Sequence, residues 1–435
     1  MIGERNEFMK EINEKFYTKS NFGAKGWLLI IFVGLMLMFC SALTNDGLNI
    51  VIPVIAGENG WDYAQLLAYS TPAGFISVIG VLVLSVLTDK FGAKLITIIS
   101  LLIAAASYIW YGHAQSPTQY FIALTLMSTF ATGAAWVSGG AYLAMYFPRK
   151  KGLALGWATM GNNLCTLAMV PLLSMMTAAF GGMGNTTLIL GVVIAALIGF
   201  CFVLPNKPED AGMTPDNLPM SADEIQQYRK EANAYVSPWT YKKLLLNKEM
   251  WLISLVLGIT MMITVGIVSQ MVTRLTSSEI GWEQPKAVAA LSVAAGVGIV
   301  GSYLWGVLDQ KITTKKATAI YMVWYGIAAF LNVVPGSIPL YISIFMIGFA
   351  LGGNANWPVS LCSSVFGHMN FAKVYSLVCP IYTFIRCCAF AVLAFFISTT
   401  GSLSGAYILF GVMAIIGAGL TILINDKKYA DGKIN

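Results

Sequence analysis

The sequence predicts an all-α polytopic membrane protein, with twelve transmembrane helices in two pseudo-symmetric six-helix halves. Hydrophobic residues make up 57% of the 435 residues and charged residues only 11%. Apolar runs repeatedly exceed the ~18 residues that mark a bilayer-spanning helix. One charged, proline-containing insert at 206–249 separates six of these runs from the other six. A soluble globular fold is therefore excluded for most of the chain.

Each predicted helix is an apolar run that ends where charged residues or clusters of Pro, Gly and Asn interrupt it. In chain order, the helices are expected at 27–56, 63–87, 95–112, 119–146, 152–180, 186–204, 251–273, 287–308, 317–334, 339–366, 374–398 and 406–424. The predicted domains are an N-terminal arm at 1–25, an N-terminal half at 26–205, a central loop at 206–249, a C-terminal half at 250–425 and a tail at 426–435.

The basic residues indicate the orientation of these helices. Of the 26 Lys and Arg residues, 23 lie in the arm, in the tail, and in the loops after the even-numbered helices. Only Arg274 and Lys286 lie in loops on the other side, and Arg386 lies inside a helix. Because the cytoplasmic side normally keeps more basic residues in short loops, we expect a cell-membrane protein with both termini cytoplasmic. The net charge of +6 then reflects topology, and no nucleic-acid partner is expected.

The two halves resemble each other in sequence. "FATGAAW" at 130–136 and "FALGGNANW" at 349–357 both open Phe-Ala-x-Gly, at an offset of 219. "LTDKFGAK" at 87–94 is echoed by "LDQKITTKK" at 308–316, where Asp309 follows Asp89 at an offset of 220. A duplicated six-helix unit predicts a substrate site near the bilayer midplane, where the repeats meet.

Three stretches resemble the major facilitator superfamily. "SVLTDKFGAK" at 85–94 is similar to the family's loop signature between helices 2 and 3, from which it departs at two positions. "PRKKGLALGWATMGNN" at 148–163 resembles the family's basic, glycine-punctuated entry into helix 5, and "PEDAGMTPDN" at 208–217 resembles the central loop of its organic-anion branches. The resemblance implies a transporter whose two halves rock about a central site, and it implies that a monomer suffices.

The loop signature also has a role that follows from its residues. Asp89 lies where the second helix ends, and a carboxylate there can accept hydrogen bonds from the N-terminal backbone of a neighbouring helix. Such a contact can hold one conformation shut and break in the other, so we predict a gating role for Asp89 and Gly92. In the second half, Asp309 takes the place of Asp89 and Ile312 that of the glycine. A solvated turn is the alternative.

Arg386 interrupts the apolar run from 374 to 398, in "PIYTFIRCC" at 380–388. Its predicted helix begins near Lys373, so a rise of ~1.5 Å per residue puts Arg386 roughly 18–20 Å into a ~30 Å core. An arginine at that depth costs ~2.5–3.5 kcal/mol on insertion scales, which disfavours a lipid-facing position. We expect Arg386 to face a water-filled central cavity. Structural pairing with backbone carbonyls or a carboxylate is the alternative.

Asp46, in "TNDGLN" at 44–49, is the sole carboxylate inside a predicted helix. It lies roughly 30 Å from the cytoplasmic end, so we expect it near the outer mouth and too shallow to pair with Arg386. An unpaired central cation predicts an anionic substrate, because a guanidinium offers a carboxylate a bidentate, charge-assisted pair. Asp46 is also the candidate for proton coupling, and hydration of the helix end is the alternative.

Other polar and aromatic side chains at similar depth would orient a ligand in a mostly apolar cavity. Tyr382 lies four residues before Arg386 and shares its helix face. For each asparagine, interhelical packing is the alternative to ligand contact. The remaining substrate-site candidates are Asn162 and Asn163 in the fifth helix, Asn354, Asn356 and Trp357 in the tenth, Trp136 in the fourth and Thr264 in the seventh.

Enzyme chemistry is not expected, because two histidines at helix ends and one carboxylate cannot supply convergent acids, bases or nucleophiles. The seven cysteines show no metal-ligand spacing, so no cofactor and no metal are expected. We therefore predict a secondary active transporter, with an organic anion, protons or a counter-anion, and the lipid bilayer as its partners. A non-transporting membrane sensor is the alternative from a different class.

With a basic residue, Arg386, in its eleventh helix, the chain resembles the oxalate:formate antiporter and monocarboxylate porter branches of the superfamily, which carry a basic residue in their binding cavity. Those branches also carry an arginine in the eighth helix, which 287–308 lacks. This departure favours a monocarboxylate over a small dianion such as oxalate. A neutral or zwitterionic substrate, with Arg386 in a structural or coupling role, is the second hypothesis.

Overall fold

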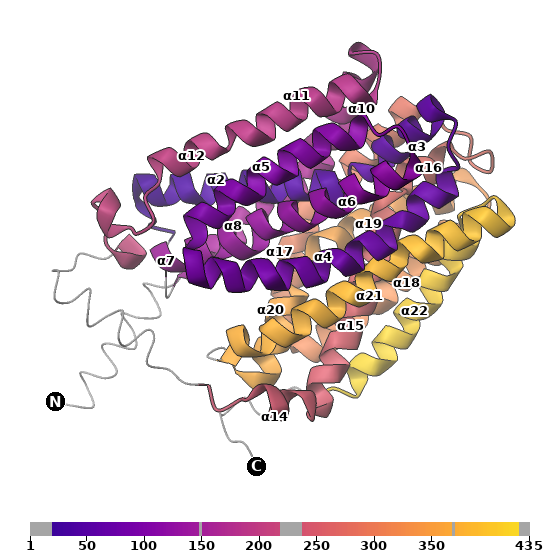
Figure 1. Cartoon of the computed structure of the whole chain (residues 1–435). Coiled ribbons are helices and arrows are strands. Elements are labelled where there is room, and N and C mark those ends of the chain that lie inside the picture. The colour runs from indigo at the N-terminus through magenta and orange to yellow at the C-terminus, as the bar shows by residue number, and fades with distance from the viewer. Residues whose placement is uncertain (1–19, 148–149, 218–236, 368–369, 426–435) are drawn as a thin grey trace.

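The computed structural model of the chain describes residues 20–147, 150–217, 237–367 and 370–425. Within these ranges the regular structure is helical, and several spans consist of more than one piece (Figure 1). In the N-terminal half, the first three spans are α2 (Gly23–Thr44) with α3 (Leu48–Asn59), α4 (Tyr63–Phe91), and α5 (Ala93–Gly112). The fourth span consists of α6 (Pro117–Thr132), the π-helical η1 (Gly133–Ser138) and α7 (Gly139–Tyr146). The fifth consists of α8 (Lys151–Ala158), α9 (Met160–Leu164), the π-helical η2 (Cys165–Met169) and α10 (Val170–Ala179), and the sixth of α11 (Met183–Ala196) and α12 (Ile198–Val203).

The C-terminal half repeats this arrangement after a central segment. That segment contains two short 3-10 turns, η3 (Glu209–Ala211) and η4 (Pro215–Asn217), and the short helix α14 (Tyr241–Leu245). The spans of the C-terminal half are α15 (Lys248–Ser269) with α16 (Met271–Thr276), α17 (Gln284–Ile312), α18 (Thr314–Leu331), α19 (Ser337–Gly353) with α20 (Trp357–Phe366), α21 (Phe371–Thr400) and α22 (Ser404–Ile422).

The number of spans depends on how polar and bent helices are treated. Ten stretches in the described ranges are long and apolar enough to cross a bilayer. The pair α19 and α20, bent by 48° at its break, makes an eleventh if it counts as one span. The sequence predicts twelve, and the difference is α18, whose first turn carries Lys315 and Lys316. Because α18 packs along both α19 and α22, it belongs to the same bundle.

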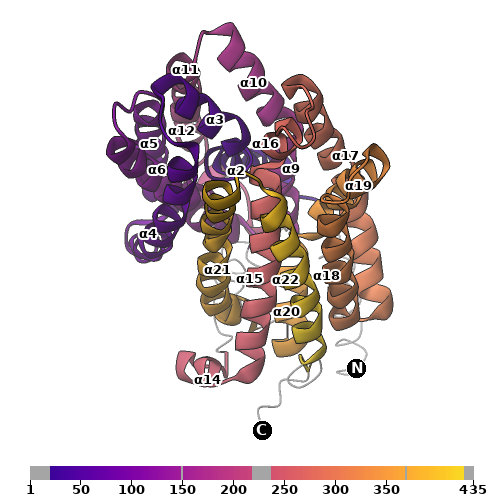
Figure 2. The same cartoon turned by 90° about the vertical axis from the view of Figure 1, so that its right-hand side faces the viewer.

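The two ends of the bundle differ in charge and in shape. In Figure 2, α14 lies at the lower end, and α3, α10 and α16 lie toward the upper end. We call the end at which α2 begins, α22 ends and α14 lies the basic side, because the described loops there carry most of the loop lysines. The other end, which holds the loops after α3, α16 and α21, is called the opposite side.

Several spans are broken at corresponding places in the two halves. The first span breaks at 45–47, between α2 and α3, and the seventh breaks at Gln270, between α15 and α16. Asn, Asp and Gly favour such breaks, because their side chains compete for backbone hydrogen bonds or their backbone is permissive. The tenth span breaks at 354–356, and its partner in the repeat, the fourth, contains the π-helical η1. Interrupted spans in matching positions of two repeats are typical of a binding site at their interface.

The turn after the second span corrects the sequence alignment of the two halves. Gly92 has φ +89° and ψ 151°, a conformation that glycine adopts freely. In the second half this conformation belongs to Thr313, with φ +86° and ψ 144°, and not to Ile312. The prediction for Ile312 was wrong because α17 extends one residue further past Asp309 than α4 does past Asp89. One residue rotates a helical side chain by about 100°, so Asp89 and Asp309 face different surroundings.

Candidate functional site

Arg386 lies midway along α21 and is partly exposed. Its guanidinium is within electrostatic range of the Cys40 thiol on α2, so it faces the N-terminal half across the interface. Within the described residues, Arg386 forms no salt bridge and no hydrogen bond to a carboxylate. The arginine is therefore a central cation at the boundary between the halves, and no anionic side chain in the described ranges neutralises it.

Contacts with α4 fix the rotation of α21 at the depth of Arg386. The hydroxyl of Thr71 donates a hydrogen bond to the carbonyl oxygen of Cys387, at 2.9 Å. The rings of Phe75 and Phe384 stack with their centroids 3.9 Å apart. Because these contacts lie on either side of Arg386 in sequence, the direction of its side chain is set by packing between the halves.

Tyr382 lies one turn before Arg386 and is within electrostatic range of it. Its hydroxyl is hydrogen-bonded to the hydroxyl of Tyr375 at 2.8 Å, and the thiol of Cys379 donates to it at 3.4 Å. The two residues thus share a neighbourhood, as the spacing predicts. The role of Tyr382 in binding stays a prediction.

A polar cluster in the N-terminal half lies on the α2 side of this interface. The hydroxyl of Ser41 donates to Oδ1 of Asn162 at 3.0 Å. Asp46, which is 8% exposed, accepts a hydrogen bond from the hydroxyl of Thr166. Cys165 is within electrostatic range of both Asp46 and Cys40. Cys40 therefore lies near Arg386, and Cys165 lies near both Cys40 and Asp46.

This cluster exists because two helices approach closely. A Cβ atom on Gly161 would lie 1.9 Å from the carbonyl oxygen of Gly34, so only glycine permits the contact between α2 and α9. Asp46 is enclosed in this structure and not at an open mouth, because the twelve residues of α3 continue beyond it. The expectation of an outer-mouth position rested on treating the first span as one straight helix, which the break at 45–47 rules out.

The candidates from the tenth span lie in a second, separate group. The hydroxyl of Thr264 donates to Oδ1 of Asn354 at 3.4 Å, and Nδ2 of Asn356 donates to the carbonyl oxygen of Ser302 at 3.2 Å. These contacts join α15 and α17 to the helix break within the C-terminal half. The structure brings these residues together around the break, and no hydrogen bond between described residues links them to Arg386.

Trp357 is fully buried inside the C-terminal half. Its ring packs against Tyr321 and Trp305, with centroid distances of 5.2 and 6.1 Å. This conformation leaves no surface of Trp357 for a ligand, so its predicted contact with substrate would need a rearrangement of this aromatic cluster. The depth of a residue, counted along the sequence, does not show whether its side chain faces the interface between the halves or the interior of its own half.

Two further candidates keep accessible surface. Trp136, in the π-helical η1, is 41% exposed, and Asn163 in α9 is partly exposed. Neither side chain forms a hydrogen bond with another described residue. Their predicted roles are compatible with this structure and stay predictions.

Apart from the bond of Thr71 to Cys387 at the depth of Arg386, the hydrogen bonds between described residues of the two halves lie toward the opposite side. Asn49 on α3 donates from Nδ2 to the carbonyl oxygen of Val268 at 2.6 Å, and its Oδ1 accepts from the backbone N–H of Val272 at 2.9 Å. One amide side chain thus satisfies two backbone groups that the break at Gln270 leaves without helical partners. The hydroxyl of Tyr63 donates to Oε1 of Gln270, which adds a contact at the same level.

A further contact connects the fifth and eighth spans on the opposite side, where Nε2 of Gln284 donates to the hydroxyl of Ser174 at 3.4 Å. The described parts of the two halves share no hydrogen bond on the basic side. The described structure is therefore a conformation that is joined on the opposite side. Sequence reasoning missed Asn49, because an asparagine in "TNDGLN" gives no sign of the backbone break that it contacts.

Arg274 links loops and helix ends within the C-terminal half on the opposite side. Its Nε donates to Oδ1 of Asn332 at 3.1 Å, and it forms a salt bridge with Glu279. Hydrogen bonds from Ser402 and Ser404, followed by the interaction with Arg274, lower the pKa of the Glu279 carboxyl to about 2. A carboxylate with a depressed pKa stabilises the fold above its ordinary value of 4.5, and this contribution is lost as the pH falls toward 2.

The gating candidates lie on the basic side. Asp89 is exposed and forms no hydrogen bond or salt bridge with another described residue. Oδ1 of Asp309 is buried and has no hydrogen-bond partner among the described residues. A carboxylate does accept from the start of a neighbouring helix here, but it belongs to Asp216, whose Oδ1 accepts from the backbone N–H of Lys150 at 2.8 Å. Among the described residues Asp89 makes no such gating contact, and its role stays a prediction.

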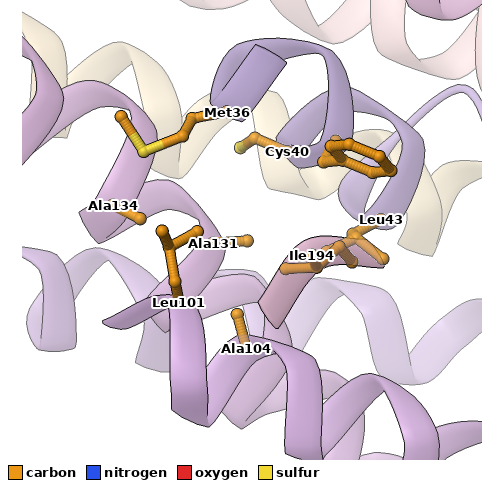
Figure 3. A pocket seen from close by; sticks show the side chains of 9 residues that line it. Met36, Cys40, Leu43, Leu101, Ala104, Ala131, Ala134 and Ile194 are labelled. Atoms are coloured by element: carbon orange, nitrogen blue, oxygen red, sulfur yellow. The ribbon is translucent and has the colours of Figure 1, made fainter. Parts of the chain in front are cut away.

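An apolar pocket lies inside the N-terminal half (Figure 3). Figure 3 shows Met36 and Cys40 on one side and Leu101 and Ala104 on the other. No charged side chain is among the residues that line it, so it does not suit a carboxylate. The full lining consists of Met36, Phe39, Cys40, Leu43, Leu101, Ala104, Ala131, Ala134 and Ile194.

Comparisons with known proteins agree with this arrangement. The family model of the Major Facilitator Superfamily matches residues 34–384. Human monocarboxylate transporter 11 is 25% identical over 182 residues, which are 41% of this chain and 36% of that protein. The uncharacterized MFS-type transporter YhjX of Escherichia coli (strain K12) is 21% identical over 298 residues, which are 67% of this chain and 69% of that protein. The match thus spans only about a third of the length of the human relative.

Solved structures show the same fold. The crystal structure of a D-xylose-proton symporter aligns with a TM-score of 0.68 at 14% identity, over 94% of this chain and 98% of that chain. A bacterial homologue of the human lysosomal transporter Spinster, in an inward-facing and occupied conformation, aligns with a TM-score of 0.66 at 13% identity, over 92% and 95% of the two chains. The predicted all-α, two-half fold class is confirmed.

Proposed function

The chain belongs to the Major Facilitator Superfamily, and we propose that it transports a small or medium organic anion, with a monocarboxylate as the first candidate. Members of this family are secondary transporters and not enzymes, so the open question is the substrate. The proposal rests on one observation. Arg386 is a central, partly exposed cation at the interface of the halves, and the described residues offer it no carboxylate.

A guanidinium in this position favours an anion for electrostatic reasons. Its charge is permanent, and its fork of N–H donors matches the two oxygens of a carboxylate. Charges are expensive inside a membrane unless they are paired or hydrated, so a ligand that brings the opposite charge offsets part of that cost on binding. One cation without a second arginine matches a monoanion better than a dianion. The similarity to monocarboxylate transporter 11 supports the same substrate class.

The orientation and the conformational state are also part of the proposal. We assign the basic side to the cytoplasm of a cell membrane, because positively charged loops are retained there. The structure then corresponds to an inward-facing state, since the described halves are hydrogen-bonded to each other on the outer side. In the outward-facing state, Asn49 would release α15 and α16, and Asp89 would gain its contact with a neighbouring helix.

Thermal stability offers a direct test of the substrate class. A ligand that binds the folded state at 100 times its Kd stabilises it by about 2.7 kcal/mol. In a panel of carboxylates and matched amides, we therefore expect the midpoint of unfolding to rise for some acids and not for their amides. Uptake of those acids into proteoliposomes then tests transport. Equal stabilisation by an acid and its amide would exclude the carboxylate as the recognised group.

Energy coupling is proposed to use Asp46 as a proton acceptor. Moving a monoanion into an electrically negative cytoplasm is opposed by ~2.3 kcal/mol per 100 mV, so accumulation needs a co-transported cation or exchange for an internal anion. Cys165 is within electrostatic range of Asp46, and Cys40 is within electrostatic range of both Cys165 and Arg386, so the surroundings of the two charges adjoin. Protonation of the carboxylate and arrival of the anion at the arginine would then influence each other.

The Asp46→Asn exchange separates proton symport from anion exchange. Because an amide cannot take up a proton but can still pair with Thr166, we expect pH-gradient-driven accumulation to be lost and exchange of internal for external substrate to continue. Both are measured as uptake of labelled substrate into proteoliposomes, with and without a pH gradient. Ser41→Ala, which removes the hydrogen bond to Asn162 in the same cluster, controls for loss of packing. Gradient-driven uptake at the wild-type rate in Asp46→Asn would move the mechanism to anion exchange.

A further inference from the structure

The segment from Thr240 to Trp251, which we call the elbow, links the central loop to the seventh span. It contains α14 and the first turn of α15, and Asn247 forms the turn between them by accepting hydrogen bonds from the backbone of Glu249 and Met250. Figure 2 shows α14 lying across the foot of α15 on the basic side. The elbow is thus an ordered corner at the surface of the membrane.

Apolar side chains on the elbow are turned outward. Leu246 is 79% exposed, and Tyr241, Leu245 and Trp251 are also exposed. The indole N–H of Trp251 donates to the carbonyl oxygen of Leu245 at 2.7 Å, so the Trp251 ring is held beside the end of α14. Exposing these apolar side chains to water is unfavourable, whereas leucine and tryptophan side chains are favourable at the boundary between lipid headgroups and acyl chains.

The charges of the elbow all have one sign on its outer face. Lys242, Lys243 and Lys248 are exposed, and none of them forms a salt bridge with another described residue. The acidic residue of the segment, Glu249, is buried, and its carboxylate accepts a hydrogen bond from the backbone N–H of Asn425 at 3.1 Å. The outer face therefore combines three lysines with exposed apolar groups, and no exposed acidic residue lies among the residues of the elbow itself.

The elbow also contacts the helix that carries Arg386. The ammonium group of Lys373, in the first turn of α21, lies 3.6 Å from the centroid of the Tyr241 ring. Hydrogen bonds from Ser376 and Lys373 lower the pKa of the Tyr241 hydroxyl below its ordinary value. The helix α14 is thus in direct contact with the basic-side end of α21.

We propose that the elbow is a binding site for anionic phospholipid headgroups of the leaflet on the basic side, and that a bound lipid holds α14 and the adjoining end of α21 in place. Leucines and the tryptophan insert beside the acyl chains while the three lysines contact the phosphate and other negative groups. This combination of basic and apolar side chains distinguishes a lipid site from a site for a soluble anion, which would not need the exposed leucines.

Neutralising the lysines tests the proposal directly. Each lysine near an anionic surface contributes enough affinity that a triple Lys242→Gln, Lys243→Gln, Lys248→Gln variant is expected to bind phosphatidylglycerol about 100-fold more weakly. Binding is measured on the full-length protein in mixed micelles, by native mass spectrometry over a titration of phosphatidylglycerol or phosphatidylcholine. The matched control is Lys311→Gln, Lys315→Gln, Lys316→Gln, which removes the same charge from another loop of the basic side.

The expected outcome is that wild type and control retain phosphatidylglycerol in preference to phosphatidylcholine, and that the elbow variant does not. Thermal midpoints should rise with phosphatidylglycerol in the first two proteins alone. Equal loss of lipid in the elbow and control variants would overturn the site, because it would reflect net charge. Competition by inorganic phosphate at the same concentration as the lipid would also overturn it in favour of a soluble anion. A double Leu245→Ser, Leu246→Ser variant, with all lysines kept, should weaken binding as well if the apolar groups contact the acyl chains.

Discussion

The Arg386→Gln variant is expected to lose carboxylate binding and transport while still folding and inserting into the membrane. Hydrogen bonds to charged groups contribute about 1.5–3 kcal/mol each, and a bidentate pair makes two of them. Loss of at least 3 kcal/mol corresponds to an affinity more than about 100-fold weaker. Folding should survive, because the described residues contain no salt bridge that the substitution would break. Removal of an unpaired charge from the membrane interior favours insertion.

The measurement is the dissociation constant of the acids that stabilise the wild-type protein, followed by their uptake into proteoliposomes. Arg386→Lys should retain measurable binding, weaker by about tenfold, since an ammonium keeps the charge but not the planar fork. Lys286→Gln removes the same charge from the opposite side, where Lys286 lies 4.2 Å from the Trp282 ring centroid, and it should bind as wild type does. Wild-type affinity in Arg386→Gln would exclude the arginine from the site and favour a neutral or zwitterionic substrate.

The depth of Arg386 in its helix could be predicted from the sequence alone, because it depends only on position along the chain. A permanent charge in an apolar run has few explanations, and counting residues gives its depth. Cys40, which lies within electrostatic range across the interface, could not be found in this way, because a buried cysteine in a helix is usually a small packing residue. The rotation of each helix about its axis decides which side chains meet, and twelve apolar helices with weak periodicity leave that rotation undetermined. Trp357 has a suitable depth but is turned into its own half.

The fold class was predictable for a different reason. Long apolar runs and the distribution of lysines follow from the bilayer itself, which leaves few ways to satisfy the backbone. Local breaks were less predictable. Asn45, Asp46 and Gly47 interrupt the first span, and this changed the position of Asp46 from an expected outer mouth to an enclosed site beside Thr166. The carboxylate contact with a helix start was expected for Asp89 and is made by Asp216, because the central loop folds back onto the N-terminal half.

Close packing between α17 and α19 leads to the prediction with the largest effect on stability. A Cβ atom on Gly352 would lie 1.8 Å from the carbonyl oxygen of Gly298 and 2.3 Å from the backbone nitrogen of Ser302. Both are backbone atoms, so the clash can be relieved only by moving the two helices apart. Small residues that permit such contact are the main means by which transmembrane helices associate. Gly352→Ala is therefore expected to destabilise the C-terminal half by about 3 kcal/mol or more, at the upper end of the range for overpacking.

The control for this prediction is Gly296→Ala in α17 itself. A Cβ atom at Gly296 meets no atom within 4 Å, so the same chemical change should be neutral or stabilising by up to about 1 kcal/mol through helix propensity. Both variants are compared by thermal unfolding of the purified protein in one detergent and by the yield of monodisperse protein. If Gly352→Ala unfolds at the wild-type midpoint, the helices are further apart than described. If Gly296→Ala and Gly352→Ala are equally destabilised, the loss of stability comes from replacing a flexible glycine in these helices and not from the contact of α17 with α19.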